Sequence, residues 1–322
     1  MDGIVVEGIG RSFGGVHAVR DATFRAKAGQ VTGLVGPNGA GKTTLLLMLA
    51  SLLAPDRGSI RVGGIDPIAD PLGARRVLGW MPDALGAWPS LTVRESLLTM
   101  ARLHGLGREG AQRRAVELLS LVGLEPLASS PAKVLSRGQK QKLGLARALV
   151  HDPQVLLLDE PASGLDPEAR VQLRVLLRRL AAEGRTVLIS SHVLSELEEV
   201  VDDTVFLVAG AVVDAPVVQA RAWRIRILSA PPADAPKAGS GTAIGADPRP
   251  PVAAALGVAT DSLGIDRGDV LAVFGDDRDA AAGLARLIGS GVTVSAFAPA
   301  QSELEQAFLS LGEAPQSGGS VR

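Results

Sequence analysis

The stretch "VTGLVGPNGAGKTTLLLML", Val31 to Leu49, joins an apolar run to a glycine-rich turn and then to a second apolar run. The branched residues from Val31 to Val35 predict a buried strand, and the run after Thr43 predicts a helix that extends to about Leu53. The glycines let backbone N–H groups turn inward, and the helix N-terminus adds roughly half a positive charge. The stretch therefore predicts a strand, a phosphate-binding loop and a helix, which together start an α/β domain.

Two side chains of this turn suit a nucleoside triphosphate. Lys42 would neutralise the β- and γ-phosphates, and the Thr43 hydroxyl would take one position on Mg²⁺. The alternative is a glycine-rich turn without function that contains a Lys-Thr pair by chance. The complete motif spacing, placed between a strand and a helix, disfavours this alternative. The residues predicted to bind ATP here are Gly36, Pro37, Asn38, Gly39, Ala40, Gly41, Lys42, Thr43 and Thr44.

A pair of acids follows a second buried strand in "VLLLDEP". Asp159 is placed at the C-terminal edge of that strand, where ligands of open α/β sheets bind, and we expect it to hold Mg²⁺ or its water shell. Glu160 is the predicted base that orients and deprotonates the attacking water. Acids after strands also cap helices, which is the alternative role for both.

Strands and helices alternate along the first two thirds of the chain. Runs such as Val155–Leu158 and Thr186–Ser190 predict a parallel sheet covered on both faces. Helical patterns without a strand fill residues 84–150, so a helical subdomain is inserted at about that range. Residues 1–216 are predicted to be an α/β nucleotide-binding domain of the P-loop NTPase class.

A small α+β domain is predicted for residues 217–312. A Pro/Gly-rich loop at 229–251 follows its first strand, "WRIRIL", and a disordered tail is expected at 313–322. Two further strands and two helices complete the domain. The last helix carries one apolar stripe, made of Leu304, Ala307, Phe308 and Leu311.

The bulk properties of the 322 residues exclude several functions. Lys and Arg total 33 against 34 Asp and Glu, so the net charge of -1 predicts no nucleic-acid partner. The absence of cysteine excludes disulfides and thiol chemistry. The acidic start and the short apolar runs predict no secretory signal and no membrane span, so we expect a cytoplasmic protein.

A second small-residue helix start lies in "LSRGQKQKLG", Leu135 to Gly144. Ser136 there is either a plain N-cap or part of an anion site at the positive end of the helix. The preceding helices, Thr92–His104 and Gly107–Val122, each run for about 20 Å, so Ser136 would lie beyond hydrogen-bond reach of ATP on its own chain. It could touch a phosphate only on another subunit, which calls for a head-to-tail homodimer.

Together these motifs resemble those of the ATP-binding cassette (ABC) family, over roughly Ile4 to Pro216. The resemblance makes "LSRGQ" the signature motif, which contacts the partner's ATP, and makes "SGLD" the D-loop that contains Asp166. It implies that His192, in "VLISSH", is the switch histidine that contacts the γ-phosphate. It also implies that Phe13, in "RSFGG", stacks on adenine, with core packing as the alternative. The signature residues are Ser136, Arg137, Gly138 and Gln139.

Two residues depart from the family pattern. Arg137 replaces the usual Gly of the signature, and we expect its side chain to point away with little loss. Asp83 in "LGWMPD" stands where the family has a Gln that reaches Mg²⁺ and the attacking water. Because Asp is shorter and charged, a bridging water, tighter Mg²⁺ binding and altered coupling to a partner all remain open.

The resemblance implies an ATPase that drives transport through a separate transmembrane permease, with the cassette on the inner face of the cell membrane. The segment "ALGAWPSLTVRESL", Ala84 to Leu97, would line the groove for that partner, with Leu85, Trp88 and Leu91 either docking or buried. The close of the second domain resembles the accessory domain of drug- and ion-exporting ABC ATPases of the daunorubicin-resistance type. For that domain we expect a dimer-stabilising or regulatory role.

Two other functions are weighed against this one. A soluble ABC ATPase that acts on DNA or ribosomes would need a long coiled-coil insertion or two cassettes in one chain, and this sequence has neither. A regulatory module that hardly hydrolyses ATP is favoured only by Asp83, whereas Glu160 and His192 argue against it.

Overall fold

The computed structural model describes residues 2–83, 86, 88, 90–214, 220–228 and 247–313. It splits into two compact units, residues 1–215 and 216–322, and each is described by itself. The tail predicted at 313–322 lies outside the described residues except for Glu313, which ends a helix instead. Most of the predicted loop at 229–251 also lies outside them.

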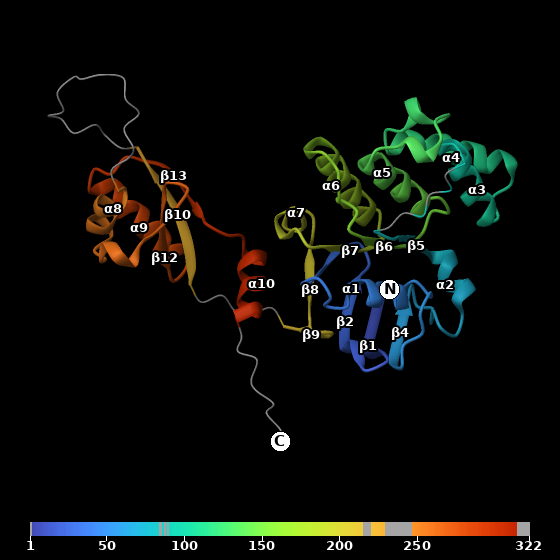
Figure 1. The fold of residues 1–322 in the computed structure, drawn as a ribbon, viewed down its shortest axis with the longest axis horizontal. Coiled ribbons are helices and arrows are strands. Elements are labelled where there is room, and N and C mark those ends of the chain that lie inside the picture. The colour runs from blue at the N-terminus through green and yellow to red at the C-terminus, as the bar shows by residue number, and fades with distance from the viewer. Residues whose placement is uncertain are drawn as a thin grey trace. The chain divides into compact units, whose positions relative to one another are not determined.

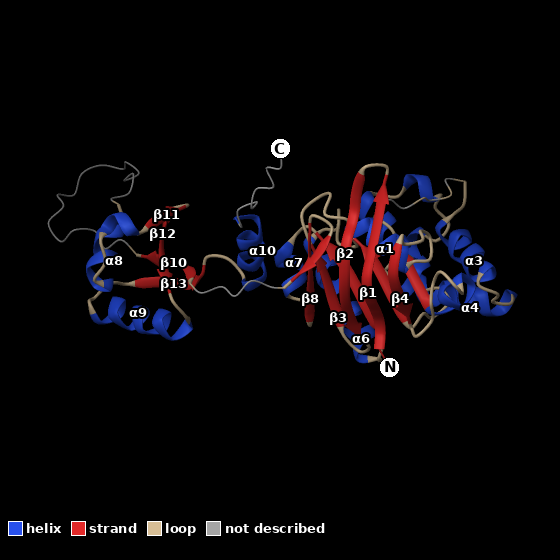
Figure 2. Cartoon of the chain, turned by 90° about the horizontal axis from the view of Figure 1, so that it is seen from below, coloured by secondary structure: helices blue, strands red, loops and turns tan. Residues whose placement is uncertain are grey.

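One sheet of nine strands forms the centre of the first unit, in the order β4-β1-β2-β9-β8-β3-β7-β6-β5. Its antiparallel strands β4, β1 and β2 lie side by side (Figure 2). Strands β8, β3, β7, β6 and β5 are parallel to one another, so their carboxyl ends meet at one edge. The strands are β1 (Asp2–Phe13), β2 (Val16–Lys27), β3 (Val31–Val35), β4 (Arg57–Val62), β5 (Leu78–Met81), β6 (Val155–Asp159), β7 (Thr186–Ser191), β8 (Asp203–Val208) and β9 (Ala211–Val213).

Burial on both faces explains why the sequences of the central strands are continuous apolar runs. Every residue of β3, β6 and β7 is buried, because helices cover both faces of a parallel sheet. The helices of this unit are α1 (Lys42–Leu49), α2 (Pro71–Val77), α3 (Val93–Leu103), α4 (Arg108–Leu121), α5 (Arg137–Ala148), α6 (Pro167–Ala182) and α7 (Leu194–Glu198), with 3₁₀ turns at Glu125–Leu127 and Ala132–Val134.

The segment between β5 and β6 is helical over its described residues. Helices α3, α4 and α5 gather on one side of the β5 and β6 edge of the sheet (Figure 1). One sequence prediction nearby is wrong: α1 ends at Leu49 and does not reach Leu53. Ser51 adopts a left-handed backbone with φ 58°, which a continuing α-helix cannot contain.

The second unit has a four-stranded antiparallel sheet in the order β11-β12-β10-β13. Helices α8 and α9 contribute to its apolar core, with Ile225 and Val270 fully buried. The predicted loop ends too late, because Arg249–Pro251 already form the first turn of α8, where proline is tolerated. The elements are β10 (Arg221–Ile227), α8 (Arg249–Leu256), a 3₁₀ turn (Thr260–Ser262), β11 (Gly264–Asp266), β12 (Asp269–Phe274), α9 (Asp277–Gly289), β13 (Val294–Pro299) and α10 (Glu303–Glu313).

Candidate nucleotide site

The loop between β3 and α1 is shaped by two glycines. Gly41 has φ 102°, and a Cβ on it would lie 2.3 Å from the Ala18 carbonyl oxygen of β2. A Cβ on Gly36 would lie 2.2 Å from the carbonyl oxygen of Leu207 in β8. The loop is therefore packed directly against two strands, and only glycine fits at these positions. Within the loop Pro37, Asn38 and Gly39 are exposed, whereas Ala40 is buried.

Lys42 is the first residue of α1, and its side chain folds back onto this loop. Its Nζ donates to the carbonyl oxygens of Gly36 at 2.7 Å and Pro37 at 3.2 Å, and the residue is 8% exposed. Burial lowers the pKa of the Lys42 ammonium, and the charges of Glu160 and Asp159 counteract this. A cation is thus held against the loop carbonyls, near the two carboxylates at the end of β6.

Asp159 ends β6 and is 3% exposed. Its Oδ2 accepts from the Thr43 hydroxyl at 3.1 Å, and its Oδ1 accepts from the Ser190 hydroxyl at 2.5 Å. Ser190 reaches it because Asp159 and Ser190 are partners in the β6 and β7 register. Two oxygen donors, Thr43 Oγ1 and Asp159 Oδ2, therefore meet beside the loop, and this donor set fits Mg²⁺.

Glu160 is fixed at its backbone and at its side chain. Its φ of 50° lies in the left-handed region, and its N–H donates to the Ser190 carbonyl and hydroxyl oxygens. Its Oε2 lies 2.8 Å from His192 Nδ1. Burial raises the pKa of the Glu160 carboxyl, while His192 and Lys42 lower it in part. A carboxylate with a raised pKa and a fixed orientation suits a general base.

Phe13 lies at the end of β1 and is 49% exposed. The Arg11 guanidinium lies over its ring, 4.9 Å from the centroid, and pairs with Asp56 at 2.6 Å. The ring is thus supported by a cation and is not part of the core. This arrangement favours the stacking role of Phe13 over the packing alternative.

The N-terminus of α5 has a complete capping box. Ser136 Oγ accepts from the Gln139 backbone N–H at 3.2 Å, and Gln139 Oε1 accepts from the Ser136 N–H at 2.9 Å. The Arg137 side chain turns toward its own chain, where its Nη2 donates to Ser163 Oγ at 2.6 Å. The expectation that it points away from the partner's phosphate stays a prediction. Because Gly164 has no side chain, the Arg137 stem can lie against it. Gly138 lies close to the same loop.

Two other predicted residues lie at the ends of elements. Asp166 caps α6 by accepting from the Ala169 N–H at 2.8 Å. Asp83 is exposed and follows β5, whose Met81 pairs with Leu158 of β6. In the predicted docking segment, Leu85 lies outside the described residues, Leu91 is half-buried, and Trp88 is 37% exposed beneath the Arg147 guanidinium.

Sequence reasoning missed Ser190 and Gln141, which hold the two acids in place. Gln141 is buried, and its Nε2 donates to the Glu160 carbonyl oxygen at 3.2 Å. The only signal for Ser190 was a hydroxyl at the end of an apolar strand. No motif marks Gln141, which contacts Glu160 only because α5 packs beside β5, next to the loop that follows β6.

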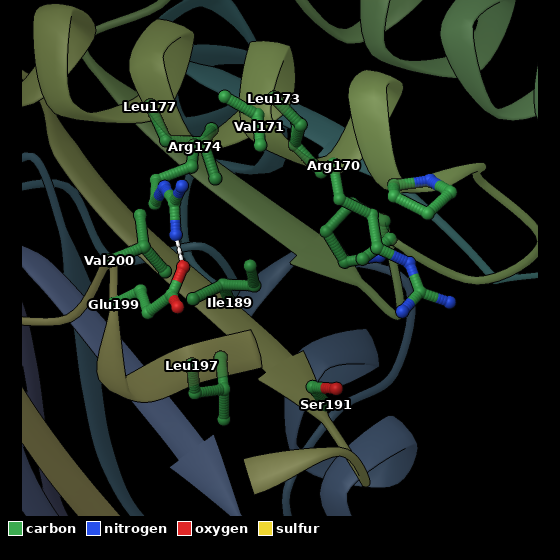
Figure 3. A pocket seen from close by; sticks show the side chains of 13 residues that line it. Arg170, Val171, Leu173, Arg174, Leu177, Ile189, Ser191, Leu197, Glu199 and Val200 are labelled. Carbon is green, nitrogen blue, oxygen red and sulfur yellow. Dashed lines mark ion pairs between the residues drawn. The ribbon is translucent and has the colours of Figure 1, made fainter. Parts of the chain in front are cut away.

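A separate cavity of about 290 Å³ lies between α6, β7 and α7. Figure 3 shows its apolar lining, with the Arg174 and Glu199 ion pair at one side and Ser191 at the other. None of the proposed reacting groups points into it, so it is distinct from the nucleotide site.

The fold and this site define a P-loop nucleotide-binding protein. The family described as ABC transporter matches residues 19–163. The ABC transporter ATP-binding protein NatA of Bacillus subtilis (strain 168) is 36% identical over 199 residues, which are 62% of this chain and 81% of NatA. The chain belongs to the ABC transporter ATP-binding protein family.

Other relatives are longer. The probable multidrug ABC transporter ATP-binding protein YbhF of Escherichia coli (strain K12) is 45% identical over 198 residues, which are 61% of this chain but 34% of YbhF. The chain thus spans about a third of that relative's length. The Nod factor export ATP-binding protein I of Burkholderia orbicola (strain AU 1054) is 42% identical over 192 residues, 60% of this chain and 63% of that protein.

Solved cassettes have the same fold. The ATP-binding subunit of an ABC transporter has a TM-score of 0.61 at 32% identity and covers 65% of this chain and 87% of its own. The dimeric ABC transporter cassette MJ0796 has a TM-score of 0.62 at 26% identity and covers 66% of this chain and 97% of its own. Among the described residues, no helix combines the length and apolar character needed to span a bilayer.

Proposed function

We propose that this chain binds and hydrolyses ATP as one half of a homodimer that drives export through a separate transmembrane permease. The convergence of Lys42, Asp159, Glu160 and His192 at one edge of the sheet carries the proposal. The relatives' names support the transport role, since they include a probable multidrug transporter and Nod factor exporters. A drug, lipid or other small molecule is the substrate class that follows from them.

Each residue has a defined task at the site. Lys42 and the loop N–H groups bind the β- and γ-phosphates, and Phe13 stacks on adenine. Thr43 and Asp159 would hold Mg²⁺, which neutralises charge on the phosphates when bound. Glu160 accepts a proton from the attacking water. His192, whose Nδ1 lies 2.8 Å from Glu160 Oε2, orients that carboxylate and contacts the γ-phosphate. For Asp83 we propose a water-mediated role toward Mg²⁺, which its position after β5 supports, since β5 pairs with β6.

The second half of each site would come from the partner. The signature residues at the start of α5 present backbone N–H groups at a positive helix end, which suits the γ-phosphate of ATP on another subunit. Ser136 can serve there while still capping its own helix, because a hydroxyl both donates and accepts. Two solved neighbours support this pairing: the MJ0796 cassette is dimeric, including in a post-hydrolysis state bound to ADP and Pi.

A complementation experiment tests the head-to-tail site. Chains with Lys42→Ala keep an intact α5, and chains with Ser136→Arg keep an intact loop. In a mixed dimer one of the two interfaces is intact, so an equal mixture should recover roughly a quarter of wild-type turnover if single sites are active. Each variant alone should be inactive.

The matched control mixes Lys42→Ala with the double variant Lys42→Ala/Ser136→Arg, which offers no intact loop in any pairing. This mixture should stay inactive. No recovery in the first mixture, with both variants folded and Ser136→Arg still binding ATP, would contradict the shared site.

The second unit, residues 217–312, is proposed to stabilise the dimer or regulate it, as in the daunorubicin-type exporters that it resembles. Deleting it should leave ATP binding intact and weaken dimer formation, measured by light scattering with a Glu160→Gln background. A dimer of unchanged affinity would contradict the dimer-stabilising role, and a change in ATP turnover alone would then indicate the regulatory one.

A further inference from the structure

Helix α5 touches the loop that carries Glu160 through two side chains. Arg137 and Gln141 are four residues apart, so they project from one face of the helix. Arg137 Nη2 donates to Ser163 Oγ at 2.6 Å, and Gln141 Nε2 donates to the Glu160 carbonyl oxygen at 3.2 Å. Both acceptors lie in the short loop between β6 and α6. One face of α5 is therefore bonded to the start and to the middle of this loop.

Two glycines bring the helix and the loop together. A Cβ on Gly138 would lie 2.9 Å from the Gly164 carbonyl oxygen, and a Cβ on Gly164 would lie 2.7 Å from Arg137 Cδ. Gly164 also has φ 74°, which favours glycine. A Cβ on Gly138 would meet the Gly164 backbone itself, so the start of α5 lies directly on this loop.

The Glu160 backbone is held from both sides. Ser190 of β7 accepts from its N–H, and Gln141 of α5 and the Ser163 N–H donate to its carbonyl oxygen. A left-handed φ at a non-glycine residue persists only where surrounding contacts enforce it. Helix α5 therefore supplies part of the constraint that aims the Glu160 carboxylate.

We propose that Arg137 and Gln141 are positioning residues that couple the two ATP sites of the dimer. This inference rests on the proposed function. A phosphate bound by the partner at the start of α5 fixes that helix, and Arg137 and Gln141 pass the constraint to Ser163 and Glu160 of the same chain. The base of one site is then aligned when the other site is filled. Arg137, at the position where the family has Gly, adds a charged hydrogen bond to this link.

The test compares full-length variants in a steady-state ATPase assay over a range of ATP concentrations. The wild type should show a sigmoidal rate curve, with a Hill coefficient between 1 and 2 for two coupled sites. Arg137→Met should lower kcat about fivefold and move the Hill coefficient toward 1, the size expected for one lost hydrogen bond. Binding of a fluorescent non-hydrolysable ATP analogue should be unchanged, since the phosphate loop is intact.

The pair itself is tested by a double-mutant cycle. Ser163→Ala should match Arg137→Met, and the double variant should be no slower than either, because both remove the same bond. Arg137→Lys should restore part of kcat, and Gln141→Leu should show the same loss of cooperativity. Arg113→Met, on the exposed face of α4, is the matched control and should behave as the wild type.

Several outcomes overturn the inference: effects of Arg137→Met and Ser163→Ala that multiply, an unchanged kcat and Hill coefficient, or a wild type without cooperativity. If thermal unfolding shows that Arg137→Met does not fold, the coupling is tested by the kcat and Hill coefficient of Ser163→Ala and Gln141→Leu. A wild-type chain that does not hydrolyse ATP refutes the proposed function itself, and the inference with it. If the wild type hydrolyses ATP but the variants change neither kcat nor the Hill coefficient, only the coupling is refuted.

Discussion

Buried charges occur in both units, and they differ in how they are paired. In the second unit Asp269 is 3% exposed, and its two oxygens accept from Arg226 Nε at 2.8 Å and Nη2 at 2.9 Å. At the sheet edge of the first unit Lys42 donates only to backbone carbonyls, and Glu160 meets a single histidine nitrogen.

The difference separates a structural ion pair from a reaction site. A bidentate Arg–carboxylate pair satisfies both partners within the fold and leaves little capacity for a ligand. Lys42, Asp159 and Glu160 instead share one edge without pairing directly, so a polyanion with a divalent cation could use all three. Buried charge alone therefore does not mark the site, whereas a cluster of charges that no bidentate arginine pair satisfies does.

The largest effect is expected from Glu160→Gln. The amide keeps the shape of the side chain but cannot accept the proton from water, so kcat should fall about 10²- to 10⁴-fold while ATP binding persists. Single-turnover hydrolysis and a nucleotide titration measure the two quantities. Glu168→Gln, an exposed acid at the start of α6, is the matched control. Turnover that survives Glu160→Gln would remove Glu160 as the base.

The second prediction uses the raised pKa of Glu160. A base must be deprotonated, so kcat should fall as the pH drops through a value above the ordinary carboxyl pKa of 4.5. His192→Gln removes the neighbour that lowers this pKa and should move the acidic limb to higher pH. A pH profile of kcat for both proteins measures this. An acidic limb that stays in place or moves lower would show that another group titrates.

The third prediction concerns the ion pair between Arg226 and Asp269 in the second unit. Arg226→Met should leave kcat unchanged and lower the unfolding midpoint of the full chain by roughly 2–8 °C at pH 7. The Arg226 hydrogen bonds hold the pKa of Asp269 below its ordinary value of 3.8. The pair therefore stabilises the fold above that pH, and the stabilisation is lost as the pH falls through the lowered pKa.

Calorimetry from pH 7 to pH 2 measures both the lower unfolding midpoint of Arg226→Met and the pH at which the difference from the wild type disappears. The wild type and the variant should converge at the acidic end. A variant that lost ATPase activity while its unfolding midpoint stayed constant would place this pair in the functional machinery after all.

Short-range patterns made the nucleotide site predictable. The strand, the glycine spacing and Lys42 lie within one continuous stretch, and Asp159 follows directly from the edge rule for parallel sheets. Contacts between distant segments were not predictable, since the chain gives no sign of which helix face meets which loop. The Arg137 to Ser163 bond and the Gln141 to Glu160 bond both depend on how α5 packs against the loop between β6 and α6.

The strained backbone conformation of Glu160 also could not be predicted from the sequence. Nothing in "LLLDEP" shows that Glu160 has a positive φ, because glycine, which would signal it, is absent. Helix ends were misjudged where one residue left the helical region, as at Ser51. The α8 start was missed because its two prolines suggested a loop, although proline also suits a first helical turn.

The smallest effect is expected from Asp83→Gln, which restores the residue that the family has. Asp83 is exposed and follows β5 at the same sheet edge, so it adds a negative charge near the metal side without closing the phosphate loop. Removing that charge should change the ATP dissociation constant by less than about threefold, because exposed charges are largely screened at physiological salt. The apparent Mg²⁺ affinity should fall slightly more.

Titrations of ATP at fixed Mg²⁺, and of Mg²⁺ at fixed ATP, distinguish the roles left open for this residue. A loss of ATP binding would make Asp83 a direct ligand. A change in Mg²⁺ affinity alone would place it in the water shell of the metal, which is the role that we propose. Unchanged affinities with altered ATPase stimulation by a permease would assign Asp83 to the coupling surface instead.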